Sequence, residues 1–441
     1  MHTPALAWWS ALPFVGLLLS IAVVPLVTPH YWESNRNKAI VAALFSLPAA
    51  AYLAGGLGAA GTHELHHKLL EYLSFITLLG ALFVISGGVY VRGSLSGTPL
   101  MNTGLLALGA LLASWIGTTG ASVLLIRPLL RANAERRRKV HVVVFFIFIV
   151  SNCGGLLTPL GDPPLFLGFL KGVPFGWTFG LWKEWLLVNG ALLVIFQIWD
   201  QVVLDREEKE EPGSLLEEVM EHEPLRIDGA QNFAFLLGVV AVIYASGSGI
   251  GTRGEPWPFG IQESLMVALA SAAYVTTPRA LRTANGFSFG PILEVAVLFA
   301  GIFVTMAPAL LLLNANAAAL GIAKPWHFFW AAGTLSSFLD NAPTYLTFAA
   351  TASGLEAIPL EGRYLAEYLG RGPHAAAILA AISTGSVFMG ANSYIGNGPN
   401  FMVKAIAEES GVRMPSFFGY MAYSVGILIP LFGIVTLVFF V

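Results

Sequence analysis

Two aspartates lie where apolar segments of this chain are interrupted by glycine and proline. Asp162 stands between Gly161 and the pair Pro163-Pro164, and Asp340 lies in a short polar stretch of another apolar segment. If these segments are membrane helices, an ionisable group there is costly and marks a functional site. Burial favours the protonated carboxyl and a nearby cation favours the carboxylate, so one such group can hold either H⁺ or Na⁺. We therefore expect Asp162 and Asp340 to be Na⁺ ligands, with capping of a half-helix as the structural alternative.

Neutral oxygen-bearing side chains accompany both aspartates in the sequence. Unwound backbone carbonyls with hydroxyl and amide oxygens form the kind of site that suits Na⁺ in transporters. For Thr118 and Thr119, hydrogen bonding to their own helix is the alternative. The four segments that carry these residues, 114–121, 151–164, 337–343 and 390–400, hold no Lys or Arg, which favours a cation over a multivalent anion as the substrate. Besides the two aspartates, the candidate ligands are Ser151, Asn152, Thr158, Thr118, Thr119, Ser337, Asn341, Asn392, Ser393, Asn397 and Asn400.

The composition places these residues in a membrane protein. Of 441 residues, 56% are apolar and 11% are charged, against about 25% charged in soluble domains. A net charge of -3 without a basic domain excludes a nucleic-acid binder, and a single cysteine, Cys153, excludes a disulfide scaffold. A chain exposed to lipid must satisfy its own backbone hydrogen bonds, so we expect an all-α polytopic protein embedded in the bilayer.

Apolar stretches of about 20 residues predict ten membrane spans. Two of them are too long and contain glycine and proline, so we expect broken helices over 139–170 and 373–410. Two further apolar stretches, about 99–126 and 326–354, have polar centres and are expected to be re-entrant hairpins. The ten spans are 6–29, 37–57, 71–91, 139–170, 178–204, 230–250, 261–277, 291–313, 373–410 and 416–441.

The distribution of basic residues predicts the orientation. With the run Arg136–Lys139 in the cytoplasm, 16 of the 23 lysines and arginines lie inside and 7 outside, as the positive-inside rule requires. Both termini are then outside. The only long hydrophilic segment, 205–229, is expected to be a cytoplasmic linker between residues 1–204 and 230–441. Short loops fit a multi-pass protein of a bacterial inner membrane.

The two parts of the chain resemble one another. Each has five predicted spans and one hairpin, and an odd number of spans inserts the second part upside down. Gly161-Asp162-Pro163 matches Gly396-Asn397-Gly398 at a separation of 235 residues, and Glu71 matches Glu294 at 223. We expect inverted-topology repeats, which place ion and substrate sites near the membrane midplane at discontinuous helices. Glu71 and Glu294 are expected to be interfacial, with a role in a proton path as the alternative.

One short motif suggests an enzyme instead. His63-Glu64-Leu65-His66-His67 satisfies H-E-x-x-H, the pattern of zinc metalloproteases. The motif lies in a predicted outer loop of about 13 residues between spans. A solvated cluster of histidines is the better interpretation, and a membrane zinc protease is a remote alternative.

The motif segments resemble the ion transporter superfamily, most closely its NhaD-type sodium/proton antiporters and the neighbouring citrate transporters. The match is carried by Ser151-Asn152 through Gly168, by Gly117–Ala121, by Asp340–Thr344 and by the break at Gly390–Asn400. The resemblance implies a homodimer with a scaffold domain and a mobile transport domain that carries the hairpins. It also implies elevator-like alternating access.

The hairpin tips depart from one branch of the superfamily. Its dicarboxylate carriers have a Ser-Asn-Thr signature there, whereas this chain has Gly117-Thr118-Thr119-Gly120 and Asp340-Asn341-Ala342-Pro343. This favours a Na⁺(Li⁺)/H⁺ antiporter, a transporter rather than an enzyme, without a resident cofactor. A Na⁺- or H⁺-coupled citrate or dicarboxylate transporter is the alternative.

Overall fold

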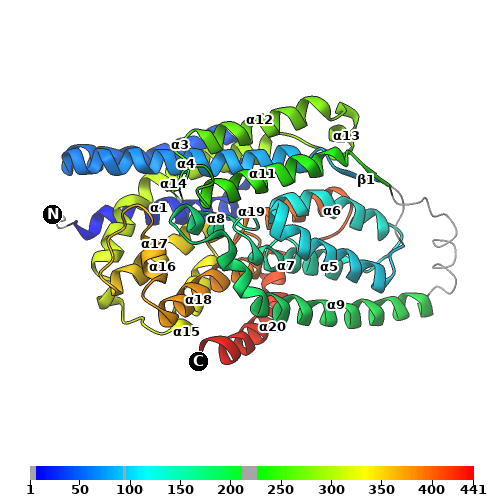
Figure 1. Ribbon diagram of the computed structural model, residues 1–441. Coiled ribbons are helices and arrows are strands. Elements are labelled where there is room, and N and C mark those ends of the chain that lie inside the picture. Colours follow the sequence, from blue (N-terminus) through cyan, green and yellow to red (C-terminus); the bar gives the residue numbers. More distant parts are fainter. Residues whose placement is uncertain (1–5, 93–95, 211–225, 254) are drawn as a thin grey trace.

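The computed structural model describes residues 6–92, 96–210, 226–253 and 255–441, and nearly all of its regular structure is helical (Figure 1). The first part of the chain contains α1 (Leu12–Val27), α2 (Pro29–Trp32), α3 (Asn35–Ala51), α4 (Gly58–Ser86), β1 (Tyr90–Arg92), α5 (Pro99–Ile116), α6 (Thr118–Ala132), α7 (Val140–Ile149), α8 (Pro163–Leu170) and α9 (Trp182–Glu210).

The second part begins with a short strand and is otherwise helical. Its β2 pairs antiparallel with β1, with Val91 opposite Ile227. The elements are β2 (Arg226–Asp228), α11 (Gln231–Gly247), α12 (Ile261–Thr276), α13 (Arg279–Ala284), α14 (Gly290–Ala315), α15 (Pro325–Ser336), α16 (Asn341–Leu355), α17 (Tyr364–Leu369), α18 (Pro373–Met389), α19 (Gly398–Glu409) and α20 (Phe417–Val435).

The prediction of an all-α polytopic membrane protein is confirmed. Within the described residues, nine helices are long and apolar enough to cross a membrane. Eight of them coincide with predicted spans, and the ninth is α5, which the sequence assigns to the first hairpin. The predicted spans 230–250 and 261–277 are present as α11 and α12, which are shorter, at 17 and 16 residues.

Both predicted helix breaks are present. After α7 the chain passes through a 3-10 turn, Cys153–Leu157, before α8 begins. The backbone folds so tightly here that a Cβ on Gly161 would lie 2.0 Å from the carbonyl oxygen of Gly155, closer than any larger residue permits. Between α18 and α19 the same close approach joins Gly396 and Gly390, at 2.5 Å. Glycine is therefore required where each break closes on itself.

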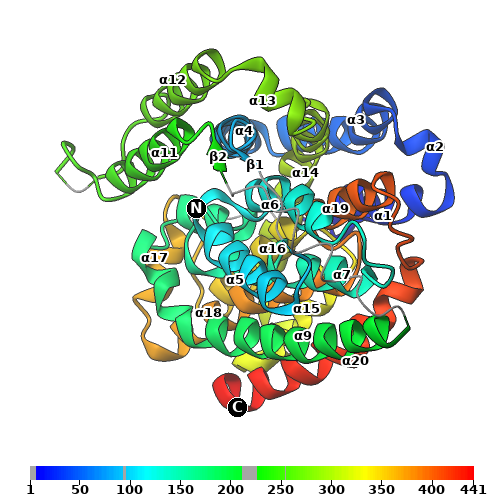
Figure 2. The same cartoon turned by 90° about the vertical axis from the view of Figure 1, so that its right-hand side faces the viewer.

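The helices form two groups. Figures 1 and 2 both show α3, α4, α11, α12 and α13 above the second group, while α1 and α14 lie at the boundary, with α1 beside α19 in Figure 2. We call α1–α4 with α11–α14 the upper layer, and α5–α9 with α15–α20 the lower bundle. In the upper layer α14 packs on α1, α3 and α4, and α12 packs on α4 and α11. The main contacts between the groups join α14 to α16 and α4 to α6 and α8. Both hairpins and both breaks belong to the lower bundle.

Three local expectations differ from the structure. The linker predicted over 205–229 begins as helix, because α9 continues to Glu210, and residues 211–225 lie outside the described part. The segment His63–His67 lies inside α4, not in a loop, because α4 extends 13 residues before the predicted span start at 71. The pairing of β1 with β2 was not predicted, since three-residue strands carry no periodicity. The inverted orientation of the two parts stays a prediction.

Candidate functional site

Asp162 is the residue before α8, and the sequence that follows determines what its side chain can bind. An N-cap carboxylate normally accepts from the second or third helical N–H group. Here the first two helical residues are Pro163 and Pro164, of which neither has an N–H, and the Asp162 side chain makes no capping bond. The carboxylate is 1% exposed. It is therefore free to accept hydrogen bonds from other elements.

Three side chains from three separate elements donate to this carboxylate. The Thr118 hydroxyl, at the start of α6, donates to Oδ1 at 2.8 Å. The Asn341 amide, at the start of α16, donates to Oδ2. The Asn397 amide, the residue before α19, donates to Oδ1 at 3.2 Å. Both hairpin tips and both helix breaks therefore meet at Asp162.

The network continues through the amides of the two breaks. Asn397 also donates to the Ser151 carbonyl at 3.1 Å and to Asn152 Oδ1 at 3.2 Å. Asn152 donates in turn to Asn400 Oδ1 at 2.7 Å. The Ser151 hydroxyl pairs with that of Ser122 at 2.8 Å. The structure thus unites seven predicted residues, Thr118, Ser151, Asn152, Asp162, Asn341, Asn397 and Asn400, in one buried network.

Three further predicted residues form a second cluster at the tip of the α15–α16 hairpin. Asn392 donates to the Ser337 hydroxyl at 2.9 Å, and the Ser393 hydroxyl donates to the Ser337 carbonyl. Asn400 donates to the Ser393 carbonyl at 2.9 Å and so joins this cluster to the first. The side-chain Oδ1 atoms of Asn392 and Asn341 are buried and accept no hydrogen bond from the described residues. They are two free oxygen ligands.

Thr158 has a structural role in the first break. Its hydroxyl donates to the Ser114 carbonyl, and the Ser114 hydroxyl donates to the Gly154 carbonyl at 2.5 Å. Ser393 and Ser337 repeat the first of these bonds in the second break. Ser114 was not among the predicted site residues. It lies 223 residues before Ser337, the separation that relates Glu71 to Glu294, so the repeat spacing could have identified it.

Asp340 lies apart from this network. It caps α16 by accepting from the Ala342 N–H at 3.0 Å, so the capping alternative describes its present contact. Asp340 and Thr119 both line a cavity of about 610 Å³ between the upper layer and the lower bundle. The structure thus places one predicted acid in the buried network and the other at the cavity wall.

The cavity reaches from the hairpin tips to the ends of α1, α3 and α14. Among the described residues that line it, three bear carboxyls, Glu33, Glu294 and Asp340, and one bears an amine, Lys38. Lys38 forms an ion pair with Glu294 at 2.8 Å. Gly161, Thr118 and Asn397 are also in the wall, so Asp162 lies directly behind it. The formal charge of the lining is negative.

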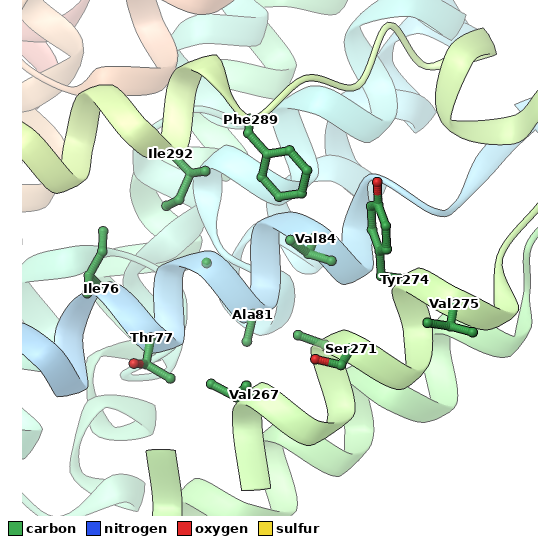
Figure 3. A pocket seen from close by; sticks show the side chains of 12 residues that line it. Ile76, Thr77, Ala81, Val84, Val267, Ser271, Tyr274, Val275, Phe289 and Ile292 are labelled. Carbon is green, nitrogen blue, oxygen red and sulfur yellow. The ribbon is translucent and has the colours of Figure 1, made fainter. Parts of the chain in front are cut away.

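A second cavity, of about 490 Å³, lies between α4, α12 and α14 (Figure 3). Figure 3 shows Thr77 and Ala81 of α4 facing Val267 and Ser271 of α12, with Phe289 near one end. Its described lining is apolar apart from a few hydroxyls and contains no carboxyl, amine or guanidinium group. Its described lining offers hydroxyl oxygens but no charged group for an ion.

The three histidines of the H-E-x-x-H segment are exposed on α4, while Glu64 and Leu65 are partly buried. The rings of His63 and His67 pack edge to face with centroids 4.5 Å apart. Within the described part of the chain, no group of three or more His, Cys, Asp or Glu side chains could hold a metal ion.

Comparison with known proteins identifies the chain at the level of its family. A search of the curated proteins found no match. One family matches over residues 3–440, which include both hairpins and both helix breaks. The protein therefore belongs to the family described as "Putative citrate transport".

Proposed function

We propose that this protein is a secondary transporter that exchanges Na⁺, or Li⁺, for H⁺, with Asp162 as the residue that binds the two ions in turn. One observation carries the proposal. A buried carboxylate in a helix break accepts hydrogen bonds from both hairpin tips and from the other break. Membership of a transport family supports the coarser part, a membrane transporter, as do the nine helices of the described residues that are long and apolar enough to span a membrane.

The hydrogen bonds around Asp162 fit the ionised state of its carboxyl. All three partners donate, and a carboxylate is an acceptor at both oxygens. Donors favour the charged form, while burial opposes it. A proton or a cation at this position would relieve the burial cost, so the two compete for one group.

Neutral oxygen ligands for the cation also lie close to Asp162. Na⁺ needs several oxygens, and the unpartnered carbonyl oxygen of Asn341 belongs to the same amide that donates to Asp162. The free side-chain Oδ1 of Asn392 would serve in the same way beside Ser337. Buried oxygens without donors are costly, and a bound cation would supply the missing interaction.

The charge of the cavity supports a cation as the transported species. Glu33, Glu294 and Asp340 outnumber Lys38 in the lining, and a cleft lined by one sign of charge concentrates ions of the opposite sign. The same field would oppose a free citrate trianion. Because the hairpin tips hold Asp162 from both sides, we propose that they move with it as one body, in the elevator manner.

Citrate transport is the second candidate, favoured by the description of the family. The cavity has a volume of about 610 Å³ and one amine, Lys38, so it offers room and one cationic group for a carboxylate substrate. A cation bound at Asp162 would be the coupling ion in this case. The residues around Asp162 would keep their role, and only the larger substrate would differ.

A flux assay separates the two candidates. Purified protein in proteoliposomes with a pH-sensitive dye inside receives Na⁺, Li⁺, K⁺ or citrate in turn. We expect Na⁺ and Li⁺ to move protons, K⁺ to have little effect, and Asp162→Asn to abolish the response. Asp205→Asn is the matched control, because Asp205 lies at the end of α9 and accepts from Gln201. Uptake of labelled citrate without cation-driven proton movement would overturn the antiporter proposal and establish the second candidate.

A further inference from the structure

One ion pair joins the lower bundle to the upper layer. The Lys171 amine, directly after α8, pairs with Glu71 Oε1 on α4. Lys68, one helical turn before Glu71, pairs with Oε2 of the same carboxylate at 3.1 Å. Because α8 begins directly after Asp162, Lys171 lies at the far end of the half-helix that carries the proposed ion ligand. The Lys171–Glu71 pair therefore joins the lower bundle, which contains Asp162, to the upper layer.

This ion pair is shielded from solvent. The side chains of Lys171, Lys68 and Glu71 are 8%, 6% and 16% exposed. Lys171 also lies over the Tyr364 ring, with its amine 5.8 Å from the centroid, and its carbonyl accepts from Leu365 N at 3.0 Å. A buried pair is costly to break, because separation leaves an uncompensated charge. A position of α8 in which this pair is formed is stabilised over one in which it is broken.

The second part of the chain also contains a glutamate and a lysine in the matching elements, but no ion pair joins them. The lysine is displaced by two residues, because the 235-residue separation matches Lys171 to Ile406 and the nearest lysine is Lys404. Glu294 of α14 corresponds to Glu71, and α19 follows the second break as α8 follows the first. The amine of α19, Lys404, pairs with Glu408 on its own helix at 2.7 Å, while Glu294 pairs with Lys38 on α3 at 2.8 Å. Neither ion pair joins the two groups of helices.

The cavity lies between Glu294 and Lys404. Glu294 lines it from the upper layer, and Tyr394 and Phe401 line it from the lower bundle. Lys404 lies over both rings, 5.5 and 5.9 Å from their centroids. The Lys171–Glu71 ion pair is therefore formed at one place on the boundary between the groups. Where Glu294 and Lys404 face that boundary, the cavity lies between them and no ion pair is formed.

We infer that the two sites act as alternating latches: Lys171–Glu71 holds the state in which the cavity is open, and Lys404–Glu294 forms when the lower bundle moves and closes that cavity. The inference rests on the proposed function, since it requires the bundle to move. Glu294 would then exchange Lys38 for Lys404, and Glu71 would keep Lys68 on its own helix. Each latch stabilises one state only, and such differential stabilisation is what shifts a two-state equilibrium.

Thiol labelling in the cavity tests the inference directly. Val295 lines the cavity, and the single native cysteine, Cys153, is buried, so Val295→Cys provides a reporter with low background. The labelling rate of the purified full chain by a soluble maleimide follows the fraction of molecules with an open cavity. The test variant is Lys171→Met. Lys68→Met is the matched control, since it removes a partner of the same carboxylate within one helix.

We expect Lys171→Met to lower the labelling rate about threefold or more, and Lys171→Arg to restore it, as for a shift of a two-state population. Lys68→Met should leave the rate near that of the parent, and Lys404→Met should not lower it. Equal rates in Lys171→Met and its parent, with both proteins monodisperse, would overturn the latch. Equal losses in Lys171→Met and Lys68→Met would overturn it too. Failure of the latch would appear as an unchanged labelling rate. Failure of the proposed function would appear differently, as absent cation-driven proton flux while the labelling shift persists.

Discussion

Asp162 and Asn397 occupy the same backbone position in the two helix breaks, and their side chains are hydrogen-bonded to each other. Each is the residue before a half-helix, with φ/ψ of -146°/144° for Asp162 and -151°/142° for Asn397. The Asn397 amide donates to Asp162 Oδ1 at 3.2 Å across 235 residues of sequence. One position carries an ionisable carboxyl and the other its neutral amide analogue. The pair therefore concentrates the titratable chemistry of both breaks in a single residue.

This asymmetry predicts the effect of Asp162→Asn. The variant keeps the shape of the side chain and removes the only ionisable group in the hydrogen-bonded network, so cation-driven proton movement should fall to the level of empty liposomes. Its thermal stability should stay close to that of the parent or rise, since a buried charge is removed. Dye fluorescence and thermal unfolding measure the two effects. Full exchange activity in this variant would remove Asp162 from the mechanism.

Two substitutions of Asp340 should distinguish the role of its charge from its role as the N-cap of α16. Asparagine caps helices about as well as aspartate, whereas alanine costs about 1 kcal/mol. Asp340→Asn keeps an acceptor for the Ala342 N–H and removes only the charge at the cavity wall. We expect Asp340→Asn to abolish exchange at parental stability, and Asp340→Ala to abolish exchange and lower the unfolding free energy. Parental exchange in Asp340→Asn, measured in the same liposomes, would assign Asp340 to capping alone.

Ser114 should matter for stability. Its hydroxyl donates to the Gly154 carbonyl at 2.5 Å and accepts from Leu157 N at 3.1 Å, so it holds the 3-10 turn against the first hairpin. Ser114→Ala leaves the Leu157 N–H without this acceptor, while the Gly154 carbonyl keeps the Trp185 indole N–H at 3.0 Å. The loss of the two Ser114 bonds should cost about 1–3 kcal/mol. Ser20→Ala is the control, because the Ser20 hydroxyl bonds only to its own helix at Gly16. Equal midpoints of thermal unfolding in the two variants would contradict this role.

The sequence predicts the breaks and most of their polar residues because glycine and proline have a direct backbone effect. The runs around Gly161 and Gly396 cannot continue a helix, and the structure interrupts both helices there. The contact between Asn341 and Asp162 could not be predicted, since it joins residues 179 positions apart and no local pattern encodes such pairing. The predicted start of the span in α4 was wrong for a different reason. Polar residues such as His63 suggest a loop, but tertiary packing extends the helix.

The Lys171–Glu71 pair should respond to alkaline pH. Lys171 lies outside the predicted spans, and its pKa is lowered to about 8, because burial disfavours the ammonium and Lys68 repels it. Glu71 and Glu64 on α4 oppose this shift, and the Tyr364 ring faces the same amine. The amine is therefore charged below about pH 8 and neutral above it. Raising the pH through this range should break the ion pair and close the cavity.

Labelling of the Val295→Cys reporter measures this closure. Thiols react faster as pH rises, because the thiolate is the nucleophile, so the rate is compared with that of Lys171→Arg carrying the same reporter. A guanidinium stays charged throughout the range. We expect the ratio of the parent rate to the Lys171→Arg rate to fall about twofold or more between pH 7 and 9, as the latched population declines. A constant ratio would show that the Lys171 charge does not govern access to the cavity, since titration of every other group affects both proteins alike.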